Sequence, residues 1–228
     1  MGQLSAVDVL GCVERGIAQT QVIGWDADVW RRDLADVDAT FEVPAVLDRL
    51  IASATAHGGL TRSDVVDIGG DDEVHLLVAS MAWGFGPLGY GAFRTAQMLD
   101  GAPEVIRGRL ADIGAAARTG EPREAFRSLF QRGRAVVRQL SIAMGTKYLY
   151  FASSDRQPDG PRPLVYDVNI FRAVRALADG PSAPPDPRRY TKGVDYERVV
   201  CWIHEQAGLF DVAPDDVEFA LFEHGKRI

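Results

Sequence analysis

The chain has 228 residues, of which 46% are hydrophobic, and carries a formal net charge of −7 at pH 7. This length allows either one domain with a proper core or two small lobes. No run approaches ~18 uncharged apolar residues, which excludes a transmembrane helix. The first 20 residues contain Asp8 and Glu14 and lack the basic and apolar segments of a secretory signal, so we expect a cytoplasmic protein.

Cysteine and histidine are too few and too scattered for a metal centre. Cys12 and Cys201 cannot form a disulfide framework or a four-thiolate cluster. The histidines show no metal-ligand spacing. They are His57, His75, His204 and His224. We therefore expect no metal ion and no other cofactor.

The first half of the chain is predicted to form helices separated by glycine and proline. Residues 43–56 place apolar side chains at helical spacing, with Pro44 at the start, where a helix tolerates proline. A second helix is expected over residues 72–81. Residues 83–91 contain four glycines and one proline, which predicts an irregular loop with unusual aromatic content. Helices are then expected over residues 93–99 and 102–118.

The second half is also predicted to be helical. A long helix is expected from Pro122 to about Leu140, then a short turn over residues 141–145 and a helix over residues 146–153. Strand signals are scarce, so the predicted fold class is mostly α. The remaining expected elements are a loop over 155–163, a short segment over 164–166, a helix over 168–178, a linker over 180–188, and helices over 196–208 and 215–223.

Positive charge is concentrated in one segment of this acidic chain. Residues 107–147 hold 9 Lys/Arg and 3 Asp/Glu, whereas residues 1–106 hold 6 and 16. On the expected helix over 123–140, four arginines fall within a sector about 60° wide. They are Arg123, Arg127, Arg134 and Arg138. Alone, such a stripe is most often a solvated face, but it could also contact phosphates.

Lys147 and Asp167 carry the chemistry that the sequence suggests. Each is expected near the start of a helix. There, the helix dipole opposes a cation and favours the neutral amine that a lysine nucleophile requires. Asp167, at an N-cap position, can accept backbone N–H bonds and stay ionised. Singly, Lys147 could be a surface residue, Asp167 an ordinary cap, and Gly145 a turn glycine.

Together, these residues resemble the signature of the helix-hairpin-helix DNA glycosylases, especially the 8-oxoguanine DNA glycosylase branch. That family has a hairpin turn ending in Gly-Thr-Lys and, about twenty residues later, a catalytic Asp that begins a helix. Gly145-Thr146-Lys147 matches the first part and Tyr166-Asp167-Val168-Asn169-Ile170 the second. The resemblance covers roughly residues 123–178.

The resemblance implies a helical glycosylase-like fold with a central cleft that takes up a nucleotide flipped out of damaged duplex DNA. Lys147 would attack the sugar, displace an oxidised purine and form a Schiff base that can break down with strand cleavage, while Asp167 stabilises charge. Expected DNA-binding residues are Ala143, Gly145, Thr146, Arg134 and Arg138. Expected base-pocket residues are Phe151, Trp83, Phe85, Phe219 and Phe222.

Two alternatives stay open. The chain has Ala143 where the family usually has glycine, and its N-terminal half is acidic. Both features would suit the same chemistry on a modified nucleoside or a non-duplex nucleic acid. An inactive DNA- or protein-binding relative is the other alternative. The chain is expected to be one glycosylase-like unit, with helical lobes over about 1–120 and 181–228 flanking a helix-hairpin-helix core over 121–180.

Overall fold

The computed structural model describes residues 6–70, 72–154, 160–177 and 184–228. Their regular structure is almost entirely helical, which confirms the prediction of a mostly α fold. Strands in the described part are limited to β1 (Phe130–Gln131) and β2 (Arg134–Ala135), which pair antiparallel. No helix among these residues is long and apolar enough to cross a membrane.

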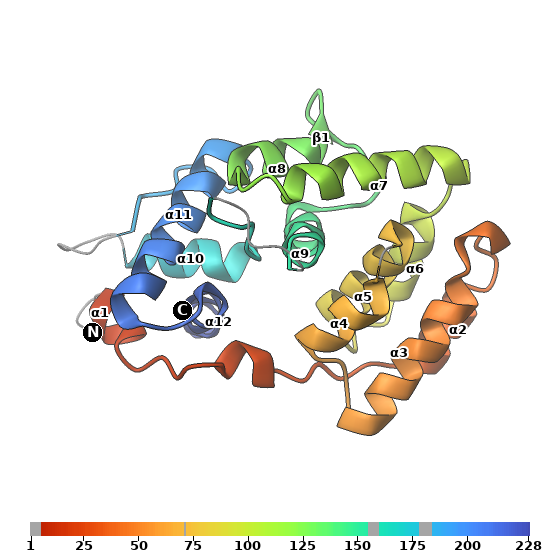
Figure 1. Cartoon of the computed structure of the whole chain (residues 1–228), viewed down its shortest axis with the longest axis horizontal. Helices are drawn as coiled ribbons and strands as arrows, with labels where there is room; N and C mark the ends of the chain where they lie inside the picture. Colours follow the sequence, from red (N-terminus) through yellow and green to blue (C-terminus); the bar gives the residue numbers. More distant parts are fainter. Residues whose placement is uncertain (1–5, 71, 155–159, 178–183) are drawn as a thin grey trace.

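One group of helices forms the right-hand part of Figure 1. It is built from α2 (Ala27–Asp33), α3 (Val43–His57), α4 (Arg62–Gly69), α5 (Glu73–Phe85) and α6 (Tyr90–Met98). The other side holds α1 (Ala6–Leu10), α10 (Val168–Ala176), α11 (Gly193–Phe210) and α12 (Pro214–Gly225).

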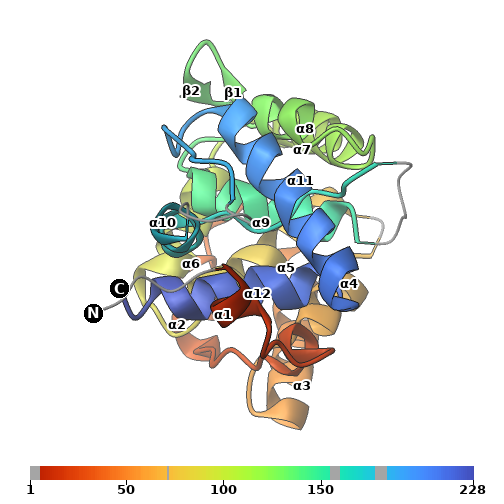
Figure 2. The same cartoon turned by 90° about the vertical axis from the view of Figure 1, so that its left-hand side faces the viewer.

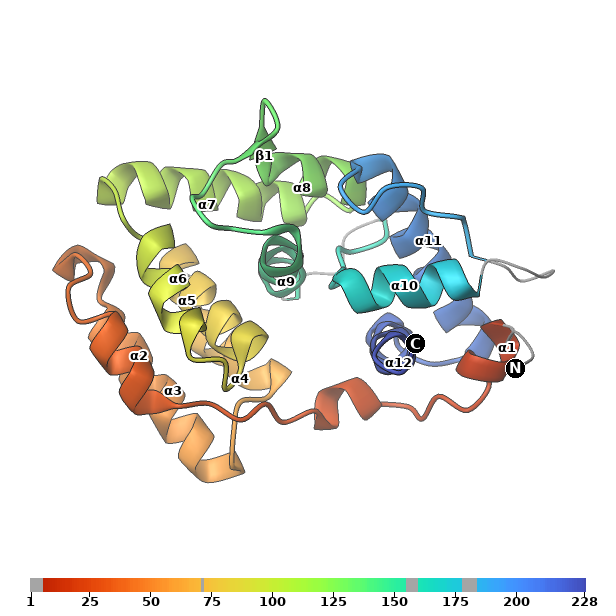
Figure 3. The same ribbon diagram turned by 180° about the vertical axis from the view of Figure 1, so that it is seen from behind.

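Three helices join the two groups. α7 (Pro103–Ala117) and α8 (Pro122–Ser128) run across the top, and α9 (Ile142–Ala152) lies between the groups, as Figure 3 shows from behind. The N-terminal α1 packs against the C-terminal α12 (Figure 2). The 3₁₀ helix Ile17–Thr20 also contacts α12, so both ends of the chain meet on one side of α9.

Side-chain caps set the starts of the helices that matter for function. Ser141 caps α9 and Asp167 caps α10, each with its side chain accepting backbone N–H groups. Thr61 and Asp64 form a reciprocal capping box at the start of α4. From Gly145 to Ala152, every residue of α9 is buried, as expected for a helix that is surrounded by others.

Several predicted helices are confirmed. α3, α7, α10 and α12 occupy the expected segments, apart from small shifts at their ends. α11 begins three residues before the expected start, at Gly193. Parts of the expected loop over 155–163, of the linker over 180–188, and the last residue of the helix expected over 168–178 lie outside the described residues.

The loop predicted over residues 83–91 is shorter than predicted, because only residues 86–89 lie outside helices. α5 continues through Phe85, and α6 already begins at Tyr90. Gly84 is a packing glycine: a Cβ there would lie 2.7 Å from Cδ of Lys147. At Gly91, a Cβ would lie 2.5 Å from Cβ of Phe85. These glycines let helices approach closely, which a count of glycines cannot distinguish from loop formation.

The long helix predicted from Pro122 to Leu140 is also wrong. α8 ends at Ser128, and the next residues form the β1–β2 hairpin. Its two turn residues, Arg132 and Gly133, have φ of 51° and 78°. Positive φ at both positions is what a type I′ hairpin turn requires. Consequently Arg134 and Arg138 do not share a helix face with Arg123, and the predicted four-arginine helical stripe does not exist.

The turn predicted over residues 141–145 is replaced by the start of α9. Gly145 is the fourth residue of this helix and Lys147 the sixth. Gly145 packs on Leu129, directly after α8, since a Cβ there would lie 2.7 Å from Cδ1 of Leu129. Lys147 is therefore one turn further from the helix start than the sequence suggested.

Candidate active site

A cavity of about 270 Å³ lies between α4, α5, α9, α12 and the start of α10. Apolar side chains form most of its wall, and four strongly acidic or basic side chains share it: Lys147, Asp167, Arg62 and Glu218. The other lining residues are Gln21, Ile23, Trp83, Gly84, Ala143, Met144, Val165, Val168, Tyr190, Phe219 and Phe222. The two residues singled out from the sequence thus open onto one hollow.

Lys147 reaches this cavity from a buried position on α9. Its residue exposure is 7%, and burial lowers the pKa of its amine below the usual value. The charges of Asp167 and Glu218 oppose this effect, whereas Arg62 adds to it. Burial, rather than the helix start that the sequence suggested, is therefore the main cause that favours the neutral amine.

Asp167 enters the cavity from the N-cap of α10. Its Oδ1 accepts hydrogen bonds from the backbone N–H groups of Asn169 and Ile170, at 2.9 and 3.1 Å. The predicted capping role is confirmed. Within the described part of the chain, Oδ2 forms no hydrogen bond, so one carboxylate oxygen is left for a ligand in the cavity.

Thr146 ties the two helices together. Its hydroxyl donates to the carbonyl oxygen of Tyr166 at 3.1 Å and accepts the N–H of Tyr166 at 3.0 Å. Because Thr146 and Tyr166 directly precede Lys147 and Asp167, these two bonds hold the amine and the carboxylate in a defined relation. The side chain of Thr146 is fully buried in this role.

A buried ion pair forms part of the wall beside Lys147. Nη1 of Arg62 lies 3.0 Å from Oε2 of Glu218, and both side chains are 3% exposed. The guanidinium also lies over the rings of Trp83 and Tyr150, at 5.1 and 5.0 Å from their centroids. Although burial opposes its charge, Glu218 raises the pKa of Arg62, so this second cation persists next to the amine.

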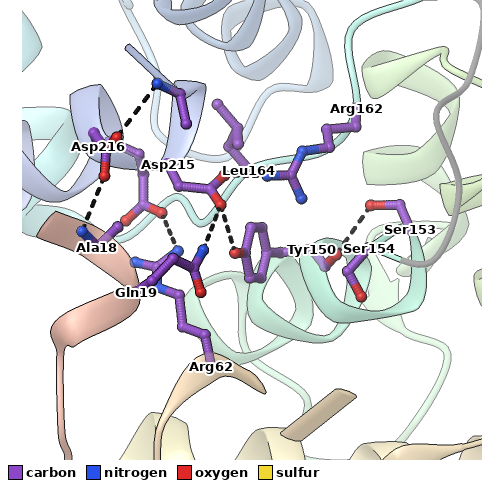
Figure 4. A network of polar contacts seen from close by, with 12 residues as sticks. Ala18, Gln19, Arg62, Tyr150, Ser153, Ser154, Arg162, Leu164, Asp215 and Asp216 are labelled. Atoms are coloured by element: carbon purple, nitrogen blue, oxygen red, sulfur yellow. Dashed lines mark hydrogen bonds and ion pairs between the residues drawn. The ribbon is translucent and has the colours of Figure 1, made fainter. Parts of the chain in front are cut away.

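α12 is held in place by two buried carboxylates at its first turn (Figure 4). Asp216 accepts the backbone N–H groups of Gly16 and Ala18, at 2.9 and 3.0 Å. Asp215 accepts the hydroxyl of Tyr150 at 2.9 Å and the side-chain amide of Gln19 at 3.1 Å. It also pairs with Arg162. These contacts fix the helix that carries Glu218, Phe219 and Phe222.

Of the five aromatic residues predicted for a base pocket, three line the cavity: Trp83, Phe219 and Phe222. The Trp83 indole N–H is buried and has no partner among the described residues. Phe151 and Phe85 do not line the cavity. Phe151 packs edge-on against Trp83 with centroids 5.3 Å apart, and Phe85 packs against Tyr90 in the same way. Both belong to the core.

The residues predicted to bind DNA are spread over two places. Ala143 lines the cavity, and Gly145 is buried against Leu129. Arg134 and Arg138 are exposed on and after the β hairpin, where Arg138 pairs with Asp100 at 2.7 Å.

Several cavity residues were missed from the sequence, above all Arg62, Glu218, Gln21 and Tyr190. Arg62 and Glu218 are 156 positions apart, and neither stands in a recognisable motif. Among the described residues, no cluster of three or more His, Cys, Asp or Glu could hold a metal ion.

A comparison with protein-family models finds one family, described as "OGG: Putative 8-oxoguanine DNA glycosylase OGG-like protein", which matches residues 17–222. Neither the comparison with curated proteins nor the one with solved structures finds a match. The matched range includes Lys147, Asp167 and every other residue that lines the cavity. The chain therefore belongs to the OGG-like family that this model describes.

Proposed function

We propose that this protein removes an oxidised purine, above all 8-oxoguanine, from DNA, with Lys147 as nucleophile and Asp167 as its partner carboxylate. The observation that carries the proposal is the shared cavity, in which a buried amine with a lowered pKa and an unshared carboxylate oxygen lie together. A nucleophilic lysine needs this kind of desolvated surrounding.

The proposed reaction begins with the neutral amine. The lone pair of the Lys147 Nζ attacks C1′ of the nucleotide, and the bond between C1′ and the base nitrogen breaks with its electron pair leaving on the base. The displaced base takes up the proton that the amine loses. Asp167 stabilises the positive charge that develops on the sugar. The nitrogen lone pair then forms a C=N bond to C1′ while the C1′–O4′ bond breaks and O4′ takes up a proton from solvent, which yields a protein–DNA iminium.

Two fates are available to this iminium. Water can hydrolyse it, which regenerates the lysine and leaves an abasic site. Alternatively, loss of a C2′ proton eliminates the 3′ phosphate and cuts the strand, which is the lyase step. We propose that both occur and that the flipped base lies against Trp83, Phe219 and Phe222, whose rings line the cavity.

The proposed DNA contact begins at the start of α9. Ala143 lines the cavity there, and the β hairpin with Arg134 and Arg138 directly precedes this helix. We propose that the start of α9 contacts the duplex beside the flipped nucleotide, as the turn of a helix-hairpin-helix unit would, and that both flanking helix groups complete one glycosylase unit.

Borohydride trapping tests the proposed chemistry, because it reduces the iminium to a stable amine. With a duplex that contains 8-oxoguanine, we expect a covalent adduct from the wild type and none from Lys147→Gln. Lys226→Gln is the matched control, since it removes an exposed lysine that pairs with Glu223. An adduct that persists in Lys147→Gln would refute the assignment of the nucleophile.

Asp167→Asn tests the carboxylate separately from the fold. Asparagine is as good an N-cap as aspartate, so α10 should remain intact while the charge is lost. We expect excision to fall by about 10²-fold or more, within the range of charge-stabilising groups. Unchanged single-turnover excision would remove Asp167 from the mechanism.

A smaller substrate is the alternative that the acidic composition favours. Salt dependence separates the two, since each phosphate contact on duplex DNA adds about 0.9 to the slope of log K against log salt. Processing that is insensitive to salt and proceeds on a free nucleoside would favour the alternative.

A further inference from the structure

A second concavity shares no lining residue with the catalytic cavity, and four arginines border it. It has a volume of about 810 Å³ and is bordered by Arg109 of α7 and by Arg132, Arg134 and Arg138 from the hairpin region. No carboxylate lines it within the described residues. Four guanidinium groups around one hollow repel each other unless an anion is present.

Most of this charge is not neutralised by the protein itself. Arg138 pairs with Asp100. Arg109, Arg132 and Arg134 form no ion pair with any residue of the described ranges. On a chain of net charge −7, such an arginine cluster is unexpected as a plain solvated surface. Its fork-shaped donors match phosphate oxygens.

Further basic side chains lie on the other side of the hairpin, next to the start of α9. A neighbouring concavity is lined by Arg123, Arg127 and Lys192, and also by Ile142 at the start of α9. The next two residues after Ile142 line the catalytic cavity. Gly133 at the hairpin tip borders this concavity, whereas Arg132 borders the four-arginine one, so the hairpin separates two basic surfaces.

The hairpin presents its arginines from a well-anchored backbone. Its type I′ turn matches the twist of the strands, and the N–H of Val136 donates to the carbonyl of Leu129 at 2.9 Å. Phe130 packs on Phe126 with ring centroids 5.6 Å apart. Less backbone freedom therefore has to be lost when an extended anion binds.

We propose that the β1–β2 hairpin is a second DNA-binding element, in which Arg109, Arg132 and Arg134 hold backbone phosphates of the duplex outside the damaged nucleotide. This inference rests on the proposed function, because it takes duplex DNA as the anion. The phosphate contacts that we expected from arginines on one helix face are thereby assigned to the hairpin.

The test compares Arg132→Gln/Arg134→Gln with Arg31→Gln/Arg32→Gln, a matched pair of exposed arginines on α2, which lies far from the hairpin in Figure 1. Binding of an undamaged duplex of about 30 base pairs, three helical turns, is measured by fluorescence anisotropy at several salt concentrations. Loss of two phosphate contacts should lower the slope of log K against log salt by about 2.

We expect the hairpin variant to show this smaller slope and weaker binding at low salt, and the α2 variant to match the wild type. On a duplex of about 10 base pairs, one helical turn, the difference between the hairpin variant and the wild type should shrink. If the hairpin variant shows the wild-type slope on the longer duplex, the inference about the hairpin is overturned, but the proposed base excision is not. A wild type whose own slope is flat would instead overturn duplex DNA as the substrate.

Discussion

Arg62 on α4 and Glu218 on α12 form a buried ion pair of 3.0 Å on the wall of the cavity that holds Lys147. The pair joins the two helix groups of the molecule, because α4 and α12 belong to different groups (Figure 1). It also places one basic and one acidic group near the amine, whose charges have opposite effects on the pKa of Lys147.

Breaking this pair should move the pH profile of excision in opposite directions. Glu218→Gln leaves Arg62 charged, which lowers the pKa of Lys147 further and shifts the acid limb to lower pH. Arg62→Met leaves Glu218 and shifts that limb to higher pH. Single-turnover excision across pH measures both shifts. Equal shifts of the same sign would contradict the electrostatic explanation.

The same variants should be less stable than the wild type. Removing one partner of a buried pair leaves the other uncompensated, at a cost of about 3–5 kcal/mol. Glu223→Gln, on the same helix and paired with exposed Lys226, should cost less than about 1 kcal/mol. Urea unfolding of the three variants gives these free energies.

Lys147→Met should stabilise the protein near neutral pH. Because burial lowers the pKa of Lys147 in the folded state below its usual value of 10.5, the unfolded state binds more protons between the two pKa values. The free energy of unfolding therefore rises with pH across that window, and below it the buried lysine destabilises the folded state. Thermal unfolding should show a gain for Lys147→Met at pH 7 that shrinks as pH rises toward 10.5. An equal gain at both pH values would mean that hydrophobic packing, not ionisation, causes it.

Gly84→Ala should impair catalysis by displacing the nucleophile. The new methyl group would lie 2.7 Å from Cδ of Lys147 and 3.2 Å from Sδ of Met144. We expect single-turnover excision to fall by about 10²-fold, the usual effect of an ångström-scale misplacement. Gly108→Ala, in α7 with open space around it, is the control and should keep full activity. Full activity in Gly84→Ala would show that the lysine tolerates the shift.

Asp216→Ala should break the contact between α12 and the N-terminal segment and so destabilise the protein. Its carboxylate accepts the N–H groups of Gly16 and Ala18, and leaving both unpaired costs about 2–6 kcal/mol. Arg15→Ala removes an exposed ion pair with Asp211 between the same two regions, and should cost less than about 1 kcal/mol. Similar losses in chemical denaturation for both variants would contradict a special role for the buried carboxylate.

Local signals in the sequence correctly predicted many helices and the cap at Asp167. The apolar spacing of α3 and the caps and prolines at helix starts act within a few residues, so they can be recognised without the fold. Errors arose where a residue serves a distant partner. Gly84 indicated a loop, although it makes room for Lys147, and Arg132-Gly133 turns the chain where helical spacing seemed to continue.

The sequence by itself determined the mostly helical class and the cap that holds Asp167, because short-range motifs encode them, and the family resemblance singled out Lys147 and Asp167 as candidates. Only the tertiary structure decided that burial controls the Lys147 amine, that Arg62 and Glu218 border the same cavity, and that Phe151 lies in the core. Desolvation and charge coupling depend on which distant helices meet, and no local pattern carries that information.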